Sequence, residues 1–272
     1  MLGHPNPPSP TQGNLQTGVS PPVSAGNEQS ESPFIRLRGV LKCYHTAAGE
    51  FEALHGIDLD VYSGEFLGIV GKSGAGKSTL VNMLTGVDHL TAGEVWVGGT
   101  RLDRLDENQL SLWRGQNLGI VYQSFYLMPS LSLLHNVMLP MDLSGLYRRG
   151  QSEHRALELL RMVELEQHAH KLPAAISGGQ QQRVAIARAL ANEPPIVVAD
   201  EPTGRLDSVT AEAIFQIFAR LIEEGKTILL VTHDPTLAER FSRVIQIVDG
   251  RIESSNGERT ILRRTAHSDG EV

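Results

Sequence analysis

The stretch EFLGIVGKSGAGKSTLVNMLTG, residues 65–86, decides the fold. It begins with a nearly continuous apolar run, typical of a strand buried on both faces. It ends in a segment with Leu80, Met83 and Leu84 on one helical face. Between them, GKSGAGKST at 71–79 fits the pattern G-x-x-x-x-G-K-[ST] of a phosphate-binding loop. A glycine-rich turn that matches by accident is the alternative, and the flanking strand and helix argue against it.

Each part of this loop suits the binding of a polyphosphate. The glycines allow backbone N–H groups to curl around phosphate oxygens, and the following helix presents the positive end of its dipole. We expect Lys77 to reach the β- and γ-phosphates, the Ser78 hydroxyl to bind Mg²⁺, and Thr79 to contact phosphate nearby. The residues expected to surround the phosphates are Gly71, Lys72, Ser73, Gly74, Ala75, Gly76, Lys77, Ser78 and Thr79.

Two further apolar runs end in residues suited to hydrolysis. PIVVAD at 195–200 is followed by Glu201, which places two carboxylates at the carboxyl edge of a buried strand, where open α/β sheets bind ligands. We expect Asp200 to hold Mg²⁺, directly or through water, and Glu201 to orient and deprotonate an attacking water. Taken alone, Asp200 is equally well explained as a helix N-cap or a solvated loop residue.

His233 follows the apolar run KTILLVT at 226–232, so we expect it at the same edge of the sheet. There it would donate a hydrogen bond to the γ-phosphate. A lone histidine usually has only a local or solvated role, and this is the alternative interpretation.

Composition divides the chain into a tail, one folded domain and a second tail. Residues 1–32, rich in Pro, Ser, Gly, Asn and Gln, are expected to be disordered. The folded domain is predicted at 33–253, and the chain turns polar again over 254–272.

The predicted domain has an α/β fold. The three apolar runs indicate a parallel core sheet. EVWVGG at 94–99 and RVIQIVDGRI at 243–252 indicate an antiparallel portion with edge or hairpin strands, the second run carrying an Asp-Gly turn. A helical pattern with Ala156, Leu160 and Val163 on one face predicts an inserted helical subdomain at about 124–190.

Charge and hydropathy exclude several classes of function. Lys and Arg number 24 against 31 Asp and Glu, and the formal net charge of −7 disfavours binding to nucleic acid. No segment approaches the roughly 20 consecutive apolar residues of a membrane-spanning helix. The N-terminus lacks the basic start and apolar core of a secretory signal. We therefore expect any transport role to depend on separate membrane partners.

The segment ISGGQQQRVAIARAL, residues 176–190, resembles the signature of ABC ATPases, which is usually LSGGQ followed by a basic helix. Ser177 can cap this helix while glycine amides form a second anion site at its N-terminus. The resemblance implies a head-to-tail dimer around two ATP molecules, in which each phosphate loop faces the signature of the other chain. The signature residues expected at the nucleotide are Ser177, Gly178, Gly179 and Gln180.

Other positions match the same family pattern in order. Tyr44 resembles the aromatic residue that stacks on adenine, although a packed tyrosine at a strand end is the alternative. Gln123, in GIVYQSF, resembles the glutamine that senses Mg²⁺ and the attacking water, and a bland loop amide is its alternative. EPTGRLD at 201–207 resembles the segment that places Asp207 across the dimer interface, and His233 matches the switch histidine.

Two departures from the family pattern are visible. Ile176 replaces the usual leucine, an apolar exchange that is not expected to remove function. Arg205 stands where relatives often carry Asn, Ala or Ser, so contacts across the dimer are expected to differ there.

Within the family, the motifs are most similar to the macrolide-exporter and lipoprotein-release ATPases. That resemblance implies a homodimer, or a pair with a related ATPase, at the cytoplasmic face of the membrane beneath permease subunits with large extracytoplasmic domains. FYLMPSLSLLHNV at 125–137 is then a candidate groove for such a partner, with ordinary core packing as the alternative. Arg263 and Arg264 offer a weak contact with anionic lipid, but a solvated tail is the favoured interpretation.

Two other classes of function are alternatives to a transporter subunit. A soluble ABC ATPase of translation or DNA maintenance would be expected to bring a second cassette, a long coiled coil or a basic face, and the sequence has none of these. A signalling scaffold, in which nucleotide-driven dimerisation regulates a membrane partner, is the remaining alternative to a transporter subunit, which the sequence favours.

Overall fold

The computed structural model describes residues 32–47 and 49–256. The predicted tails therefore lie outside the described residues, apart from Ser32 and residues 254–256. The two arginines considered for lipid contact also lie outside them. Within the described part of the chain, no helix combines the length and the apolar character needed to cross a membrane.

The predicted parallel core sheet is present, and it has six strands. Five of them, β9, β3, β8, β7 and β6, are parallel, and β10 pairs antiparallel with β9 at one edge. The strands, in spatial order, are β10 (Arg251–Asn256), β9 (Arg243–Val248), β3 (Phe66–Val70), β8 (Thr227–Thr232), β7 (Ile196–Asp200) and β6 (Leu118–Tyr122).

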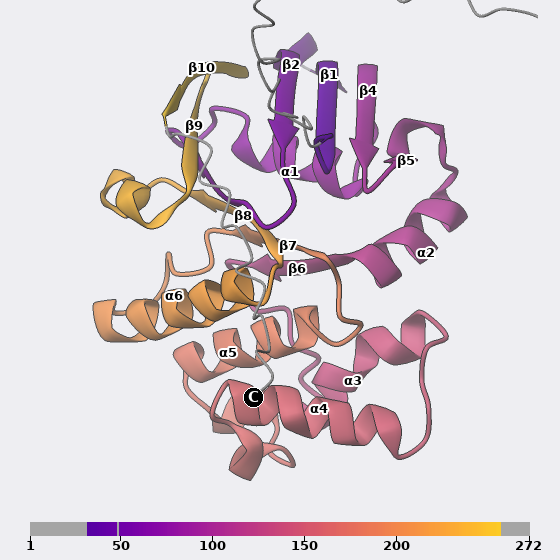
Figure 1. Ribbon diagram of the computed structural model, residues 1–272, viewed down its shortest axis with the longest axis vertical. Helices are drawn as coiled ribbons and strands as arrows, with labels where there is room; N and C mark the ends of the chain where they lie inside the picture. The colour runs from indigo at the N-terminus through magenta and orange to yellow at the C-terminus, as the bar shows by residue number, and fades with distance from the viewer. Residues whose placement is uncertain (1–31, 48, 257–272) are drawn as a thin grey trace, which may run out of the picture. The chain divides into compact units, whose positions relative to one another are not determined.

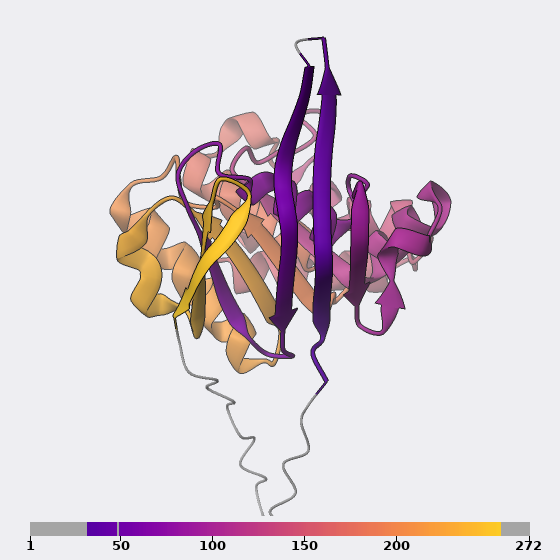
Figure 2. The same ribbon diagram turned by 90° about the horizontal axis from the view of Figure 1, so that it is seen from above.

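The predicted antiparallel portion is a separate four-stranded sheet. Its spatial order is β2 (Gly49–Val61), β1 (Ile35–Thr46), β4 (Ala92–Val97) and β5 (Thr100–Arg101). Figure 2 shows the long strands β1 and β2 running side by side, with β4 beside β1.

Helices cover both faces of the core sheet. One of them, α1, lies between the two sheets and contacts β7 on one side and β2 and β4 on the other. The α-helices are α1 (Lys77–Thr85), α2 (Glu107–Asn117), α3 (Leu133–Leu143), α4 (Gln151–Met162), α5 (Gly178–Ala189) and α6 (Ser208–Glu223). Short 3-10 segments are η1 (Leu102–Arg104), η2 (Glu166–His168), η3 (Pro173–Ala175) and η4 (Pro235–Arg240). Figure 1 shows α3, α4, α5 and α6 together on the face opposite α1.

The central strands β3, β8 and β7 are almost entirely apolar because each is buried on both faces. Along β8, Ile228 and Leu230 pack with the helices α3–α6, whereas Leu229 and Val231 pack with α1 and the antiparallel sheet. The two faces of one sheet thus belong to two separate hydrophobic clusters. This explains why a period-two alternation of apolar and polar residues is missing from these runs.

The structure extends the sequence-based interpretation at the sheet's edges. Strand β6, which precedes Gln123, was not predicted, because LGIVY is short and Val121 is its only fully buried side chain. Strand β9 was predicted as an edge or hairpin strand, yet it pairs with β3 inside the core sheet and leaves the edge to β10. The Asp-Gly turn predicted between β9 and β10 is present, with φ of 43° at Asp249 and 71° at Gly250.

Candidate functional site

Four parallel strands end at one edge of the core sheet and deliver the candidate site. Strand β3 runs into the loop at 71–79, and Gln123, Glu201 and His233 each follow directly on a strand end. The pairing of Tyr122 with Asp200, of Asp200 with Val231, and of Val70 with Thr232 places these ends level with one another. A cavity of about 400 Å³ lies there, lined by Ser73, Ser78, Gln123, Asp200, Glu201 and His233.

Glycine is required at three positions of the loop for different structural reasons. A Cβ atom on Gly71 would lie 2.4 Å from the carbonyl oxygen of Ile247, so a side chain there would clash with backbone. Gly76 has a φ of 104°, and its Cβ would lie 2.8 Å from the carbonyl oxygen of Ala53. Gly74 has a φ of 81° but faces open space, so it is required by conformation alone.

Lys77 begins α1 and is buried, at 7% exposure. Its ammonium group donates hydrogen bonds to the carbonyl oxygens of Gly71, at 2.8 Å, and Lys72, at 2.9 Å. The lysine thus closes the loop around its own side chain. This arrangement holds a cation at the N-terminal end of α1, where anions are favoured.

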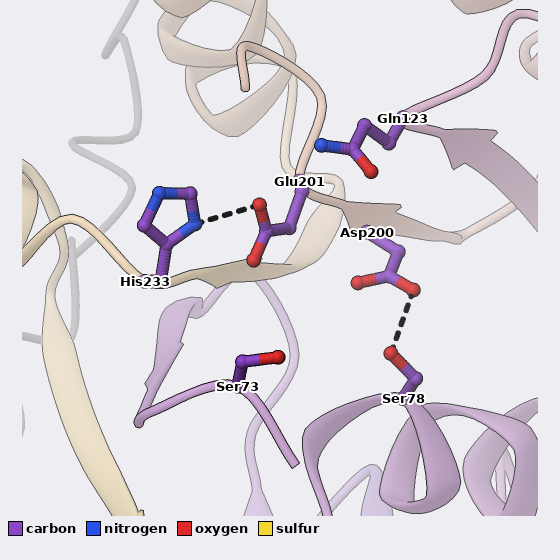
Figure 3. Close-up of a pocket in the computed structure, with 6 residues that line it drawn as sticks. All are labelled: Ser73, Ser78, Gln123, Asp200, Glu201 and His233. Carbon is purple, nitrogen blue, oxygen red and sulfur yellow. Dashed lines mark hydrogen bonds and ion pairs between the residues drawn. The ribbon is translucent and has the colours of Figure 1, made fainter. Parts of the chain in front are cut away.

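Ser78 and Asp200 form a pair of oxygen ligands. The Ser78 hydroxyl donates to a carboxylate oxygen of Asp200 over 3.1 Å (Figure 3). Burial raises the pKa of Asp200, and the charge of Glu201 raises it further, while the Ser78 hydrogen bond and the charge of Lys77 oppose this. A hydroxyl and a carboxylate are hard oxygen donors, so their chemistry fits Mg²⁺.

Glu201 is held by its backbone and by His233. Its φ of 49° lies in the left-handed region, which is unusual for a residue with a side chain. Its N–H donates to the carbonyl oxygen of Val231 over 3.0 Å. The Nδ1 atom of His233 lies 2.7 Å from a carboxylate oxygen of Glu201 (Figure 3). The acid expected to activate water is therefore directed into the cavity by two independent contacts.

Gly204 lies against this site and was not singled out in the sequence. A Cβ atom there would be 2.9 Å from Nε2 of Gln123 and 3.2 Å from Oε2 of Glu201. The glycine in EPTGRLD was the available signal, because a close approach to a functional group is one reason for glycine outside turns.

The cavity lining includes neither the signature residues nor Tyr44 and Asp207, and of the expected phosphate-loop residues it includes only Ser73 and Ser78. Ser177 and Gln180 form a capping box at the start of α5, with hydrogen bonds of 3.3 and 3.0 Å. Asp207 caps α6 by accepting hydrogen bonds from the backbone and hydroxyl of Thr210, and these lower its pKa. A Cβ on Gly179 would lie 2.3 Å from the Thr210 side chain. The starts of α5 and α6 are thus closely packed together.

Tyr44 also lies apart from the cavity lining. Its hydroxyl donates to Asp88 over 3.0 Å. Burial raises the pKa of this hydroxyl. The hydrogen bond with Thr79 lowers the pKa, and the hydrogen bond with Asp88 raises it. The residue is therefore anchored by groups on and just after α1.

Arg188 of α5 holds the segment that follows Gln123, and the sequence carried no signal for it. Its guanidinium donates to the carbonyl oxygens of Phe125, at 2.8 Å, and Tyr126, at 2.5 Å. Burial lowers its pKa. Tyr126 has a φ of 45°, so Arg188 stabilises a segment in an uncommon backbone conformation.

The chain is similar to known ATP-binding proteins over most of its length. A family model described as "ABC transporter" matches residues 54–204. YknY of Bacillus subtilis, an uncharacterized ABC transporter ATP-binding protein, is 42% identical over 84% of this chain and 99% of its own length. The macrolide export ATP-binding/permease protein MacB of Escherichia coli is 42% identical over 81% of this chain, which corresponds to 34% of MacB.

Solved structures agree with the sequence comparison. The ATP-binding cassette MJ0796 of Methanocaldococcus jannaschii is 45% identical over 80% of this chain and 95% of its own length. Its dimeric structure bound to ADP and Pi, a post-hydrolysis state, covers 84% of this chain and all of the MJ0796 chain, with a TM-score of 0.77. The predicted resemblance is thereby confirmed, and the chain belongs to the ABC transporter family as an ATP-binding, ATP-hydrolysing subunit.

Proposed function

We propose that two copies of this chain close around two MgATP molecules, and that closing and reopening move membrane subunits bound to them. The single observation that carries this proposal is the cavity in which the Glu201–His233 pair faces the Ser78–Asp200 pair across the phosphate loop. The proposed domain at 33–253, with its helical subdomain at about 124–190, contains every residue used in this cycle.

The phosphate loop binds the substrate in this proposal. The loop residues 71–79 direct backbone N–H groups at phosphate oxygens, and Lys77 exchanges its contacts with loop carbonyls for the β- and γ-phosphates. Ser78, Asp200 and Gln123 supply oxygen ligands for Mg²⁺. When bound, Mg²⁺ neutralises charge on the β- and γ-phosphate oxygens.

Hydrolysis follows from the acid at the end of β7. Glu201 accepts a proton from water as the water oxygen bonds to the γ-phosphorus, and the bond between that phosphorus and the bridging oxygen of ADP breaks. His233 donates a hydrogen bond to the γ-phosphate, so the site responds to ATP and not to ADP. A site with equal affinity for both nucleotides would not shift the equilibrium between open and closed states.

The second half of each site comes from the other chain. Ser177 caps the start of α5, whose first residues are Gly178, Gly179 and Gln180, and Asp207 caps the neighbouring start of α6. We propose that these residues, which are not part of the cavity lining in their own chain, face the nucleotide of a partner. The dimeric structures of the relative MJ0796 support the pairing of two chains.

The membrane partners are proposed from the relatives and from one surface. The relative MacB is an ATP-binding/permease protein. For this chain we propose separate permease subunits with large extracytoplasmic domains. The chain then works at the cytoplasmic face of the membrane. Of the predicted groove at 125–137, Leu133 and Val137 are buried in the core, whereas Tyr126 and Met128 are 64% and 45% exposed. The exposed pair is the part available to a partner.

The test is ATP hydrolysis and size-exclusion mass, measured with MgATP on wild type, Glu201→Gln and Ser177→Arg. We expect wild type to hydrolyse ATP, Glu201→Gln to accumulate as an ATP-bound dimer, and Ser177→Arg to do neither. Absence of an ATP-dependent dimer, even with membrane subunits present, would contradict the proposal.

A matched control separates loss of the trans contact from loss of a helix cap. Asp106 forms a capping box with Gln109 at the start of α2, as Ser177 does with Gln180. Asp106→Arg therefore removes a comparable cap, which is worth about 1 kcal/mol, and is expected to retain hydrolysis and dimerisation. Equal loss of dimer in both variants would assign the effect to helix stability.

A further inference from the structure

Lys42 is a buried cation next to Tyr44, the residue expected to stack on adenine. It lies in β1 with 8% exposure, where an unpaired ammonium group is costly. Its Nζ donates to a carboxylate oxygen of Asp88 over 2.8 Å and to the carbonyl oxygen of His89 over 2.6 Å. The same atom lies 4.7 Å from the centroid of the Tyr44 ring, within the range of a cation–π contact.

Asp88 connects this cation to the tyrosine. One carboxylate oxygen accepts from Lys42, and the other accepts from the Tyr44 hydroxyl over 3.0 Å. The backbone of Asp88 is itself tied to α1, because its N–H and that of Val87 donate to the carbonyl oxygen of Asn82. Asp88 thus joins β1 to the helix whose other end carries the phosphate loop.

These contacts restrict the Tyr44 ring in two ways. The hydrogen bond at the hydroxyl limits movement of the ring about its side-chain torsions, and the Lys42 ammonium occupies one ring face. An aromatic base can then stack only on the opposite face. Restricting a side chain before binding lowers the entropy lost when the ligand binds.

We propose that Lys42 and Asp88 are positioning residues that hold Tyr44 as a platform for the nucleotide base. The inference rests on the proposed function, which places ATP on that loop. Stacking does not depend on base identity, because every base has a π-face. The platform therefore strengthens binding of ATP and GTP alike and leaves binding of the phosphates unchanged.

The test is calorimetric titration of the full chain with ATP, GTP and inorganic triphosphate, without added Mg²⁺ so that hydrolysis does not consume ligand. We expect Lys42→Met and Asp88→Ala to lower the affinity for both nucleotides by about five- to tenfold, within the range of base–aromatic stacking. Binding of inorganic triphosphate is expected to stay unchanged. Tyr44→Phe keeps the ring but loses the hydrogen bond to Asp88. It should lower the affinity for ATP and GTP and leave the affinity for triphosphate unchanged.

A double substitution distinguishes positioning from a general structural role. If Asp88 acts through the ring, Asp88→Ala should have no further effect on ATP binding in a Tyr44→Ala background. Asp60→Ala is the matched control, because Asp60 also pairs with a cation of β1, Arg38, at 2.8 Å. It should leave all three affinities unchanged.

Each result has a definite meaning. Unchanged ATP affinity in Lys42→Met and Asp88→Ala would overturn the inference, and so would equal weakening of ATP and triphosphate. If wild type binds neither ATP nor triphosphate, the proposed function itself is wrong. Wild type that binds triphosphate and ATP equally well would overturn the base platform alone.

Discussion

The Nδ1 atom of His233 lies 2.7 Å from Oε2 of Glu201, and the two side chains differ in exposure, at 60% and 19%. The histidine therefore lies on the open side of the acid, where a γ-phosphate would be held. We expect His233→Ala to lower kcat by about 10²-fold or more, because a positioned hydrogen-bonding group is lost from both the acid and the phosphate.

The same variant, His233→Ala, is expected to affect ATP binding but not ADP binding. Binding of ADP to His233→Ala should match wild type, whereas ATP binding should weaken, as measured by titration calorimetry. His154→Ala removes a comparable surface contact, at 3.2 Å from Glu158, and should change neither value. Equal weakening of ADP and ATP would show that His233 does not sense the γ-phosphate.

Gly204 is predicted to tolerate no side chain during catalysis. In Gly204→Ala, the added methyl group would meet the amide of Gln123 at 2.9 Å and the carboxylate of Glu201 at 3.2 Å. Both groups must shift, and small displacements of reacting groups reduce rates strongly. We expect kcat to fall about tenfold or more while the melting temperature stays close to that of wild type, because Gly204 is exposed. Full activity would show that these two groups can move without cost.

Arg188 is predicted to couple the signature helix to the segment after Gln123. Arg188→Met leaves the carbonyl groups of Phe125 and Tyr126 without their donor, which should destabilise the protein by about 1–3 kcal/mol in urea unfolding. The freed segment should also lower kcat, with little change in ATP affinity.

Arg183→Met provides the comparison on the same helix. Arg183 donates to the carbonyl oxygen of Val163 and to Glu164, away from the cavity. A similar loss of stability is expected for this variant, with kcat close to that of wild type. A lower kcat in both variants, in proportion to stability, would remove any specific role for Arg188.

The ionised carboxylate of Asp200 is predicted to destabilise the nucleotide-free protein. Burial raises its folded-state pKa above the unfolded value, so the ionised carboxylate disfavours folding at neutral pH. This penalty is absent below the unfolded pKa of about 4 and grows as pH rises through the folded pKa. Asp200→Asn should therefore melt at or above the wild-type temperature at pH 7, with the advantage disappearing towards pH 4.

Function should change in the opposite direction in that variant. Asp200→Asn loses an anionic oxygen ligand, so Mg²⁺-dependent hydrolysis should fall to background. Differential scanning calorimetry at several pH values, together with phosphate release, checks both parts. A lower melting temperature at pH 7 would show that the carboxylate stabilises the empty site.

Much of the fold followed from local patterns. The runs that became β3, β7 and β8 were recognisable because a strand buried on both faces is apolar at every position. Strand β6 was not predicted because it lies at the sheet edge and Val121 is its only fully buried side chain. The predicted helical face of Ala156, Leu160 and Val163 is buried, each at 1% exposure or less.

The sequence by itself determined which chemical groups this protein has for nucleotide binding, because the phosphate loop, the paired acids and the signature are each continuous in the chain. Only the tertiary structure decided which of these groups meet. Parallel pairing brings Gln123, Glu201 and His233 to one edge, because hydrogen-bonded strands align their ends regardless of separation in sequence. The Lys42–Asp88 contact and the approach of Gly204 to Gln123 arise in the same way, from packing between segments that share no local pattern.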